Sequence, residues 1–248
     1  MSSITLLGAG NLATHLALSL HQAGHTITQV FSKTKESAQL LSNRLDCPYT
    51  TDLKSILPTD IAIIAVNDDA IKEVEKHISF PKIHTSGSMS IDCLNGKNIG
   101  VLYPIQSFSK NKTVDLSETP ICIEANNDMF LQQIETLARS LSNYVLPLKS
   151  QQRAHLHLSA VMACNFSTLM YVLAEEICSK HAIPFDLLHP LIEETAKKVN
   201  DMNPSAALTG PAKRGDASVL KQHAHLLESD QEKKQIYQLL SRSIAKRN

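Results

Sequence analysis

The chain has 248 residues, enough for one large domain or two of ordinary size, and its 24 Lys and Arg residues balance 24 Asp and Glu residues. This neutral charge gives no sign of a nucleic-acid surface or a polybasic membrane patch, so we expect neither partner. No leader-like segment opens the sequence, and no apolar run approaches the roughly 18 residues of a membrane span, so we expect a cytoplasmic protein. The five cysteines form no CxxC pair, which predicts reduced thiols.

Short apolar runs alternate with amphipathic stretches as far as about residue 148, which is typical of strands and helices that follow one another in an α/β sheet. The runs at 4–8 and 60–66 are the most continuously apolar, as strands buried on both faces should be. We therefore expect residues 1–149 to form a doubly wound, mainly parallel Rossmann sheet. The candidate strands are residues 4–8, 26–32, 47–50, 60–66, 82–86, 98–104, 120–125 and 144–148.

The pattern becomes helical after Ser150. No proline or glycine occurs from Gln151 to Lys180, and apolar residues surround most of residues 156–177, which predicts a buried helix. A Pro- and Gly-bearing loop is expected at 202–216, with one helix before it and a helix pair at 217–228 and 230–246 after it. Residues 150–248 should therefore form an all-α domain, with the domain boundary near residue 149.

A glycine-rich turn follows the first candidate strand. Gly8, Gly10 and Ala13 satisfy the G-x-G-x-x-G/A pattern, in which the first glycine makes a tight turn, the second admits a pyrophosphate and the small third residue lets helix and strand pack. A strand precedes the motif and a helix that stops at Gly24 follows it, which is the context that the motif requires. A dinucleotide site is thus favoured over an ordinary glycine turn.

The end of the second candidate strand indicates which dinucleotide fits. An NAD site carries an acidic residue there for the ribose 2′-hydroxyl, whereas a 2′-phosphate needs hydrogen-bond donors and positive charge. This chain has Ser32, Lys33, Thr34 and Lys35, with no acid before Glu36. These residues favour NADP(H), although the same tetrapeptide could be a solvated basic turn.

Several motifs resemble one superfamily. GAGNLA (8–13), AVND (65–68), HTSGS (84–88) and GVLYPIQSFSK (100–110) resemble the pyrroline-5-carboxylate reductases and the 6-phosphogluconate and β-hydroxyacid dehydrogenases. With PICIEA, QRAHLHLSAV, LLHPLIEET and TGPAKRGD added, the chain is similar to a branch of Rossmann-like NADP oxidoreductases that carry a C-terminal domain of unknown function. The resemblance implies a nicotinamide over the strand ends, covered by a 6-phosphogluconate dehydrogenase-like helical domain that forms a homodimer.

Position by position, the resemblance also implies site residues. Ser86–Gly87 and Tyr103–Pro104, with Gln106 of the same motif as Tyr103, correspond to turns that line the nicotinamide and substrate pocket. The implied cofactor residues are Gly8, Gly10, Asn11 and Leu12 for the pyrophosphate, Ser32 and Lys33 for the adenosine end, and Ala65, Val66 and Asn67 for the nicotinamide ribose.

Reduction of a C=O or C=N bond needs a proton donor beside the hydride carrier. His84 ends a candidate strand, where ligands bind in open α/β sheets, but it could equally well only hydrogen-bond the adjoining turn. His157 and Asn165, on the predicted central helix, are either pocket residues or satisfied core polar groups. His155 and His157 point in different directions on that helix, so we expect no metal site.

The hydroxyacid dehydrogenases carry a lysine one turn before the central asparagine, whereas this chain has Val161 there, so their mechanism is not implied. Lys197 and Arg214 are candidates for binding an anionic group, with an exposed helix face and a capped turn as the simpler readings. We therefore predict an NADP(H)-dependent oxidoreductase that reduces a C=O or C=N bond of a small polar substrate, which could carry a carboxylate. The alternatives are a non-catalytic NADP-binding sensor and a deazaflavin-linked NADP oxidoreductase.

Overall fold

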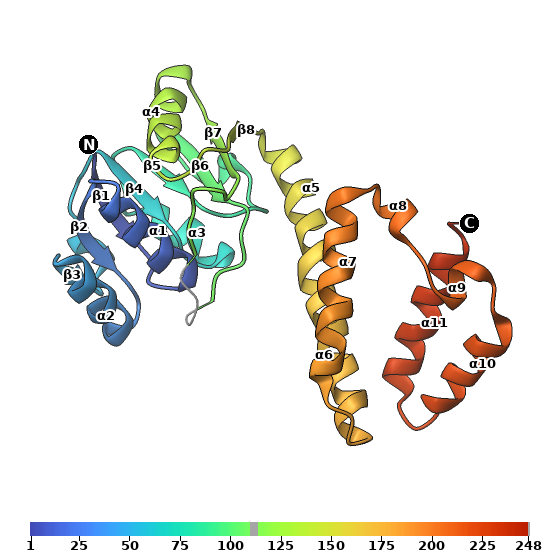
Figure 1. The fold of residues 1–248 in the computed structure, drawn as a ribbon. Helices are drawn as coiled ribbons and strands as arrows, with labels where there is room; N and C mark the ends of the chain where they lie inside the picture. The colour runs from blue at the N-terminus through green and yellow to red at the C-terminus, as the bar shows by residue number, and fades with distance from the viewer. Residues whose placement is uncertain (110–113, 248) are drawn as a thin grey trace. The chain divides into compact units, whose positions relative to one another are not determined.

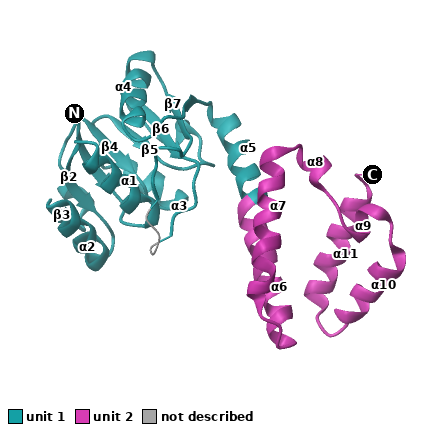
Figure 2. Cartoon of the chain, in the orientation of Figure 1, with its two compact units in different colours: residues 1–163 teal, residues 164–248 magenta. Residues whose placement is uncertain are grey.

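The computed structural model describes residues 1–109 and 114–247 (Figure 1). The chain divides into two compact units, residues 1–163 and residues 164–248, which are coloured separately in Figure 2. Unit 1 contains the sheet and unit 2 is helical, which confirms the predicted fold class.

The sheet of unit 1 has eight strands in the order β3-β2-β1-β4-β5-β6-β7-β8. The first six run parallel, in the order typical of dinucleotide-binding folds, while β7 runs antiparallel to β6 and β8 runs parallel to β7. The strands are β1 (Ser3–Leu7), β2 (Thr26–Phe31), β3 (Tyr49–Thr50), β4 (Ile61–Ile64), β5 (Lys82–His84), β6 (Ile99–Pro104), β7 (Ile121–Ala125) and β8 (Val145–Pro147).

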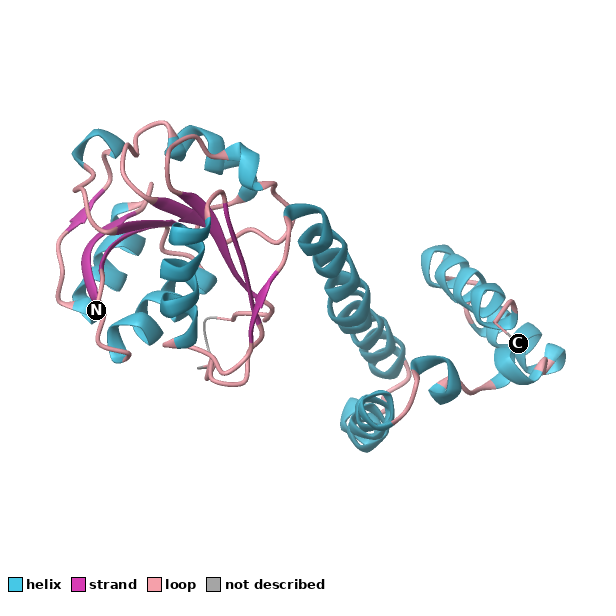
Figure 3. Cartoon of the chain, turned by 90° about the horizontal axis from the view of Figure 1, so that it is seen from above, coloured by secondary structure: helices cyan, strands magenta, loops and turns pink. Residues whose placement is uncertain are grey.

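Helices cover both faces of this sheet (Figure 3). Because side chains alternate along a strand, Ile61 and Ile63 of β4 join one apolar cluster, while Ala62 and Ile64 join another. Helices α1 (Asn11–Gln22), α2 (Lys35–Leu45) and α4 (Asp128–Arg139) contribute to the first cluster, and α3 (Asp68–Glu75) contributes to the second. Both faces are therefore buried, which explains the continuously apolar strands.

One continuous helix runs from Ser150 to Lys180, and the division between the units falls inside it. It consists of α5 (Ser150–Ala160), a π-helical turn (Val161–Asn165) and α6 (Phe166–Lys180). By length and composition this helix could cross a membrane, which corrects the expectation that no segment approaches a span, although the core helix of a soluble protein passes the same test. The predicted boundary at 149 coincides with the start of α5 and stays a prediction.

Unit 2 has almost no core of its own. Among its described residues Ala212 alone is buried, so the expectation of a buried helix at 156–177 is wrong for the single chain. An apolar helix pattern indicates that the helix is covered, but not that the same chain covers it. The helices after α6 are α7 (His189–Asp201), α8 (Pro204–Ala207), α9 (Pro211–Arg214), α10 (Ala217–Leu226) and α11 (Gln231–Ala245), so the predicted loop at 202–216 contains α8 and α9.

Candidate functional site

The glycine turn after β1 comes very close to the end of β4. Gly8 has a φ of +126°, and a Cβ atom there would lie 2.1 Å from the carbonyl oxygen of Ala65. Backbone hydrogen bonds fix this approach: the Gly8 amide donates to Phe31 over 2.8 Å, and the Ala65 amide donates to Leu7 over 2.7 Å. Position 8 therefore accepts glycine and no other residue without a rearrangement of the backbone.

Gly10 has a different reason to be glycine. It precedes α1 with extended backbone, and a Cβ atom there would meet nothing within 4 Å. The first turn of α1 carries no acidic residue that would compete with a ligand for its amides or for the positive end of its dipole. This arrangement suits a pyrophosphate lying against the backbone.

The segment after β6 contacts the first turns of α1. The side-chain amide of Asn11 donates to the Phe108 carbonyl oxygen over 3.1 Å, and the rings of His15 and Phe108 lie with centroids 5.3 Å apart. Two motifs far apart in sequence, GAGNLA and YPIQSFS, therefore meet at the glycine turn. Lys110, which ends the second motif, lies outside the described residues.

A cavity of about 460 Å³ lies at the carboxyl ends of the parallel strands of unit 1. Open α/β sheets bind their ligands at this edge. Most of the predicted site residues of unit 1 line this cavity, together with Pro104 of the predicted Tyr103–Pro104 turn and three residues that were not assigned to the site: Ala13, Asp68 and Thr85. The predicted residues among its lining are Gly10, Asn11, Leu12, Ala65, Val66, Asn67, Ser86, Gly87, Tyr103, Gln106 and His157.

The turn after β5 is held by hydrogen bonds to Ser86. The Ser86 hydroxyl accepts from the amides of Ser88 (3.1 Å) and Met89 (3.0 Å), and the Ser86 amide donates to Nδ1 of His84 (3.1 Å). Asp68, at the start of α3, accepts a hydrogen bond from the Ser88 hydroxyl. Ser86 thus shapes the cavity wall, and Asp68 places a carboxylate in it.

His84 lies beneath this turn and not in the cavity lining. It is fully buried, and its Nε2 atom has no hydrogen-bond partner among the described residues. Burial and the nearby positive charge of Arg153 lower the pKa of His84 to about 4, so the ring is neutral at neutral pH. Its Nδ1 accepts from an amide, so the proton of the neutral ring sits on Nε2. The predicted role as proton donor gains no support from this placement.

Tyr103 and His157 form a pair in the cavity lining. The Tyr103 hydroxyl lies 3.0 Å from Nδ1 of His157, and the two rings meet edge to face with centroids 5.8 Å apart. A Cβ atom on Gly87 would lie 2.8 Å from atoms of both rings, so the glycine makes room for the pair. Burial raises the pKa of Tyr103, which keeps the phenol protonated.

A buried guanidinium fixes the helix that carries His157. Arg153, one turn earlier on α5, is fully buried and donates to the carbonyl oxygens of Ser86 (3.2 Å) and Met89 (2.5 Å). It also forms an ion pair with Glu124 at the end of β7, and Glu124 accepts from both the amide (2.9 Å) and the hydroxyl (2.7 Å) of Ser150. Sequence reasoning missed Arg153, because a helical arginine resembles a surface residue until its partners are known.

Ser32 and Lys33 lie outside the cavity, at the end of β2. The Ser32 hydroxyl accepts from the amide of Thr34 over 3.4 Å, and the side chains of Lys33, Thr34 and Lys35 are exposed. The donors expected for a 2′-phosphate are therefore available to a ligand, with no acidic side chain at the strand end. Thr34 precedes α2, so the N-terminus of that helix adds positive potential here.

The remaining predicted residues belong to unit 2. Asn165 ends the π-helical turn, Lys197 lies on α7, and both are exposed. Arg214 is also exposed and directs its guanidinium to Asp216, with Nη2 2.7 Å and Nε 3.0 Å from one carboxylate oxygen. None of the described residues forms a cluster of His, Cys, Asp and Glu that could hold a metal ion.

Together, the strand order, the close approach at Gly8 and the open helix N-terminus beside the cavity define a dinucleotide-binding protein of the doubly wound class. Residues 3–96 match the family described as NADP oxidoreductase, coenzyme F420-dependent, and residues 119–244 match the domain of unknown function DUF2520. The chain belongs to the family of NADP oxidoreductase-like proteins that carry this DUF2520 domain.

Solved structures agree with this assignment. A "putative NADP oxidoreductase" from Bacteroides fragilis is 41% identical, with a TM-score of 0.94 over 99% of this chain and 98% of that chain. Two others share the fold at 13% identity: a 1-pyrroline-5-carboxylate reductase from Streptococcus pyogenes (TM-score 0.65, 99% and 98% covered) and an imine reductase from Myxococcus stipitatus in complex with NADP⁺ (0.66, 98% and 92%). Among curated proteins, none matches this chain.

Proposed function

We propose that the protein is an NADP(H)-dependent oxidoreductase that reduces a C=O or C=N bond of a small polar substrate. The observation that carries this proposal is the cavity at the strand ends, which has the open glycine turn on one side and the Tyr103–His157 pair on another. A cofactor bound along the strand ends would supply hydride to the substrate there. The 41% identical Bacteroides fragilis structure, described as an NADP oxidoreductase, supports the same cofactor.

This chain's residues fit that cofactor at three places. Gly10 leaves space for a pyrophosphate at the N-terminus of α1. Ser32 and Lys33 would bind the 2′-phosphate, and Ala65 to Asn67 would lie along the nicotinamide ribose at the carboxyl end of β4. No lysine or arginine is among the cavity-lining residues of unit 1, and Lys197 and Arg214 stay sequence-based candidates for binding an anionic group.

Replacement of Ser32 with aspartate is expected to reverse the cofactor preference. A carboxylate at this strand end would repel the 2′-phosphate and accept from a ribose 2′-hydroxyl, which is the arrangement in NAD sites. We expect NADPH affinity to fall by about tenfold or more while NADH affinity rises, and Lys33→Ala to weaken NADPH alone. Titration of nicotinamide fluorescence measures both, with the exposed Lys54→Ala as control. Tighter binding of NADH than NADPH by the unchanged protein would contradict the assignment.

The reaction class is tested by NADPH oxidation with a panel of 1-pyrroline, glyoxylate, pyruvate and simple aldehydes. We expect turnover of at least one imine or carbonyl compound. A protein that binds NADPH tightly and oxidises it with no member of the panel would instead be an NADP-binding sensor. A second candidate is a deazaflavin-linked oxidoreductase, which the description of the matching family over residues 3–96 favours. Hydride exchange between NADPH and coenzyme F420 would distinguish it.

The functional unit is a homodimer formed through the helical domain. Large apolar side chains of α6 that would be buried in a folded core are exposed in the single chain, among them Phe166, Leu169 and Val172. A helical unit with one buried residue in its described part gains too little from apolar burial to offset the conformational entropy lost on folding. A second copy of the chain carries the same apolar faces and could bury them against this unit. A solvent-exposed surface of this kind marks an interface.

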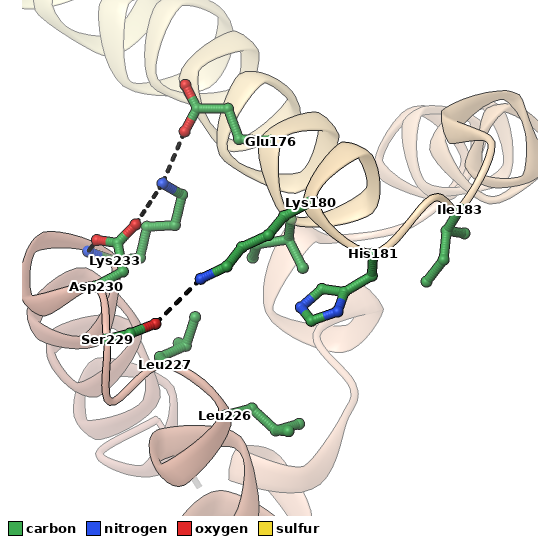
Figure 4. A pocket seen from close by; sticks show the side chains of 10 residues that line it. Glu176, Lys180, His181, Ile183, Leu226, Leu227, Ser229, Asp230 and Lys233 are labelled. Carbon is green, nitrogen blue, oxygen red and sulfur yellow. Dashed lines mark hydrogen bonds and ion pairs between the residues drawn. The ribbon is translucent and has the colours of Figure 1, made fainter.

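Two hollows of unit 2 belong to this surface. One, of about 280 Å³, is an apolar groove between α6 and α11 that includes Leu173, Ile177 and Ile236. The other, of about 330 Å³, is shown in Figure 4, where Lys233 reaches Glu176 and Asp230, both over 2.7 Å, and Lys180 donates to Ser229 over 3.1 Å. Subunit interfaces combine an apolar core with a polar rim, and these two hollows offer both kinds of surface.

The purified protein is therefore expected to sediment at twice the chain mass of 27.3 kDa. The double variant Leu169→Glu/Val172→Glu should abolish the dimer and reduce helical content, because it places two charges in the apolar surface of α6. Leu40→Glu, on an exposed position of α2 in unit 1, is the matched control and should leave the dimer intact. A wild-type monomer with full helical content would exclude the dimer.

A further inference from the structure

We propose that Tyr103 and His157 form a proton relay, in which the Tyr103 phenol gives the proton to the reduced substrate and His157 replaces that proton. This inference rests on the proposed reductase function and names the groups that would complete its reaction. Three observations carry it: the contact between the two side chains, the space that Gly87 leaves for them, and the anchoring of α5 by Arg153.

The contact joins two elements that are distant in the chain. Tyr103 lies in β6 at its carboxyl end, paired with Cys122 of β7, and His157 lies on α5. Their 3.0 Å separation is a hydrogen-bond distance, and both side chains line the cavity that also holds Ala65 and Asn67, where the nicotinamide ribose is expected. A proton donor must be within hydrogen-bond reach of the reacting atom, and the proposal places that atom in the cavity beside the Tyr103 hydroxyl.

Gly87 and Arg153 hold the pair in place. Any side chain at position 87 would collide with both rings, since its Cβ would lie 2.8 Å from each. Arg153 binds the carbonyl oxygens of Ser86 and Met89 on either side of Gly87, and it lies one turn before His157 on α5. The turn and the helix are therefore fixed to one another by a single buried side chain, which sets the position of His157 against Tyr103.

The proton balance of the step is complete. Hydride from NADPH forms a C–H bond, the electron pair of the C=O or C=N double bond moves to the oxygen or nitrogen, and the Tyr103 O–H proton bonds to that atom. In the same step the Tyr103 oxygen takes the proton from Nδ1 of a protonated His157, which becomes the neutral imidazole. His157 is partly exposed, so water can supply the next proton. The other titratable groups around the pair are Asp68 in the cavity lining, Cys122 on β7 and Arg153 on α5.

Two variants test the relay, assayed with whichever panel compound the wild type reduces. Tyr103→Phe is expected to lower kcat by about 10²- to 10³-fold and to change NADPH affinity by less than about threefold, because it removes proton transfer but not cofactor contacts. His157→Gln keeps the phenol and a hydrogen-bonding side chain. It should lower kcat by about tenfold, because the glutamine amide cannot return a proton to the phenol.

The solvent isotope effect distinguishes a relay from a structural role. Two protons move in the wild-type step, so kcat should depend on the deuterium fraction of the solvent along a curve, which becomes linear in His157→Gln. The matched controls are Tyr144→Phe and His155→Gln, both exposed and outside the cavity, and both should behave as the wild type.

The outcomes distinguish a failure of the relay from a failure of the proposed reductase function. If the wild type binds NADPH but reduces no panel compound, the proposed reductase function fails, and the relay fails with it. If the wild type turns over and Tyr103→Phe retains more than about a third of its kcat, the relay is wrong and the reductase function stands. A linear isotope dependence in the wild type would remove His157 from the step.

Discussion

Replacement of Gly8 with alanine is expected to destabilise unit 1 by about 3 kcal/mol or more, because the new methyl group must displace backbone and the residue keeps a conformation that L-residues rarely adopt. The Cβ atom would lie 2.1 Å from the Ala65 oxygen, at a φ of +126°. Relief of that contact would separate the ends of β1 and β4, and the residues that follow these strands, Gly10 to Ala13 and Ala65 to Asp68, line the cavity. Urea unfolding followed by circular dichroism measures the loss.

Gly10→Ala is the matched comparison, and we expect it to weaken NADPH binding while leaving the stability of unit 1 nearly unchanged. The residue has a φ of −78°, which alanine adopts readily, and its Cβ would meet nothing within 4 Å, so stability should change by less than about 0.5 kcal/mol. NADPH affinity should nevertheless fall by about tenfold or more, because the methyl group occupies the space proposed for the pyrophosphate. Unchanged affinity in this variant would place the pyrophosphate elsewhere.

Replacement of Arg153 with methionine is the second change with a large expected effect. Glu124 would keep its charge at the end of β7 without the guanidinium, and the oxygens of Ser86 and Met89 would each lose a donor. Breaking a buried ion pair on one side costs about 3–5 kcal/mol, so we expect a loss of that size in the free energy of unfolding. Thermal and urea unfolding measure it.

Two further variants show whether the loss comes from the buried charge. Arg153→Met combined with Glu124→Gln should be more stable than Arg153→Met alone, because the unpaired carboxylate is gone. Arg139→Met removes an exposed partner of Glu135 on α4 and should cost less than about 1 kcal/mol. An equal loss in Arg139→Met and Arg153→Met would contradict a special role for the buried pair.

The sheet could be predicted from the sequence because its strands are buried on both faces. The apolar runs at 4–8 and 60–66 correspond to β1 and β4 at the centre of the sheet. The reversal between β6 and β7 has no comparable signal, since hydrophobic periodicity does not encode strand direction. The edge strand β3, predicted over residues 47–50, forms over Tyr49–Thr50 only.

The helical half was predicted in its elements but not in its burial. The pattern of α6 indicates an apolar surface all round the helix, yet within the described chain no residue of α6 is buried. Sequence periodicity reports how apolar a helix face is and gives no information about which molecule covers it. The expectation of burial and the observed exposure agree only if a second molecule covers this surface, as the proposed dimer would.

Sequence reasoning predicted the site residues whose identity is set by the local shape of the backbone. It missed those whose role depends on partners far away in the chain. Gly8, Gly10 and Gly87 appear in recognisable turns, and the geometry at each turn explains the glycine or the open space beside it. His84 was expected in the cavity but lies beneath it, because a strand residue two positions before the turn can point to either side. Arg153 depends on Glu124, 29 positions away in the chain, which no local pattern reveals.

The anchoring of α5 also decides how this protein can be dissected. A fragment that stops at residue 149 would leave Glu124 without Arg153 and lack the wall of the binding cavity that His157 forms. A fragment that continues to Ala163 would retain both the anchor and the wall. In its sequence pattern α5 resembles the start of the helical domain. Its first turns are nevertheless an inseparable part of unit 1. Domain exchange with a relative would preserve the chemistry of the sheet unit only if the junction were placed beyond those turns.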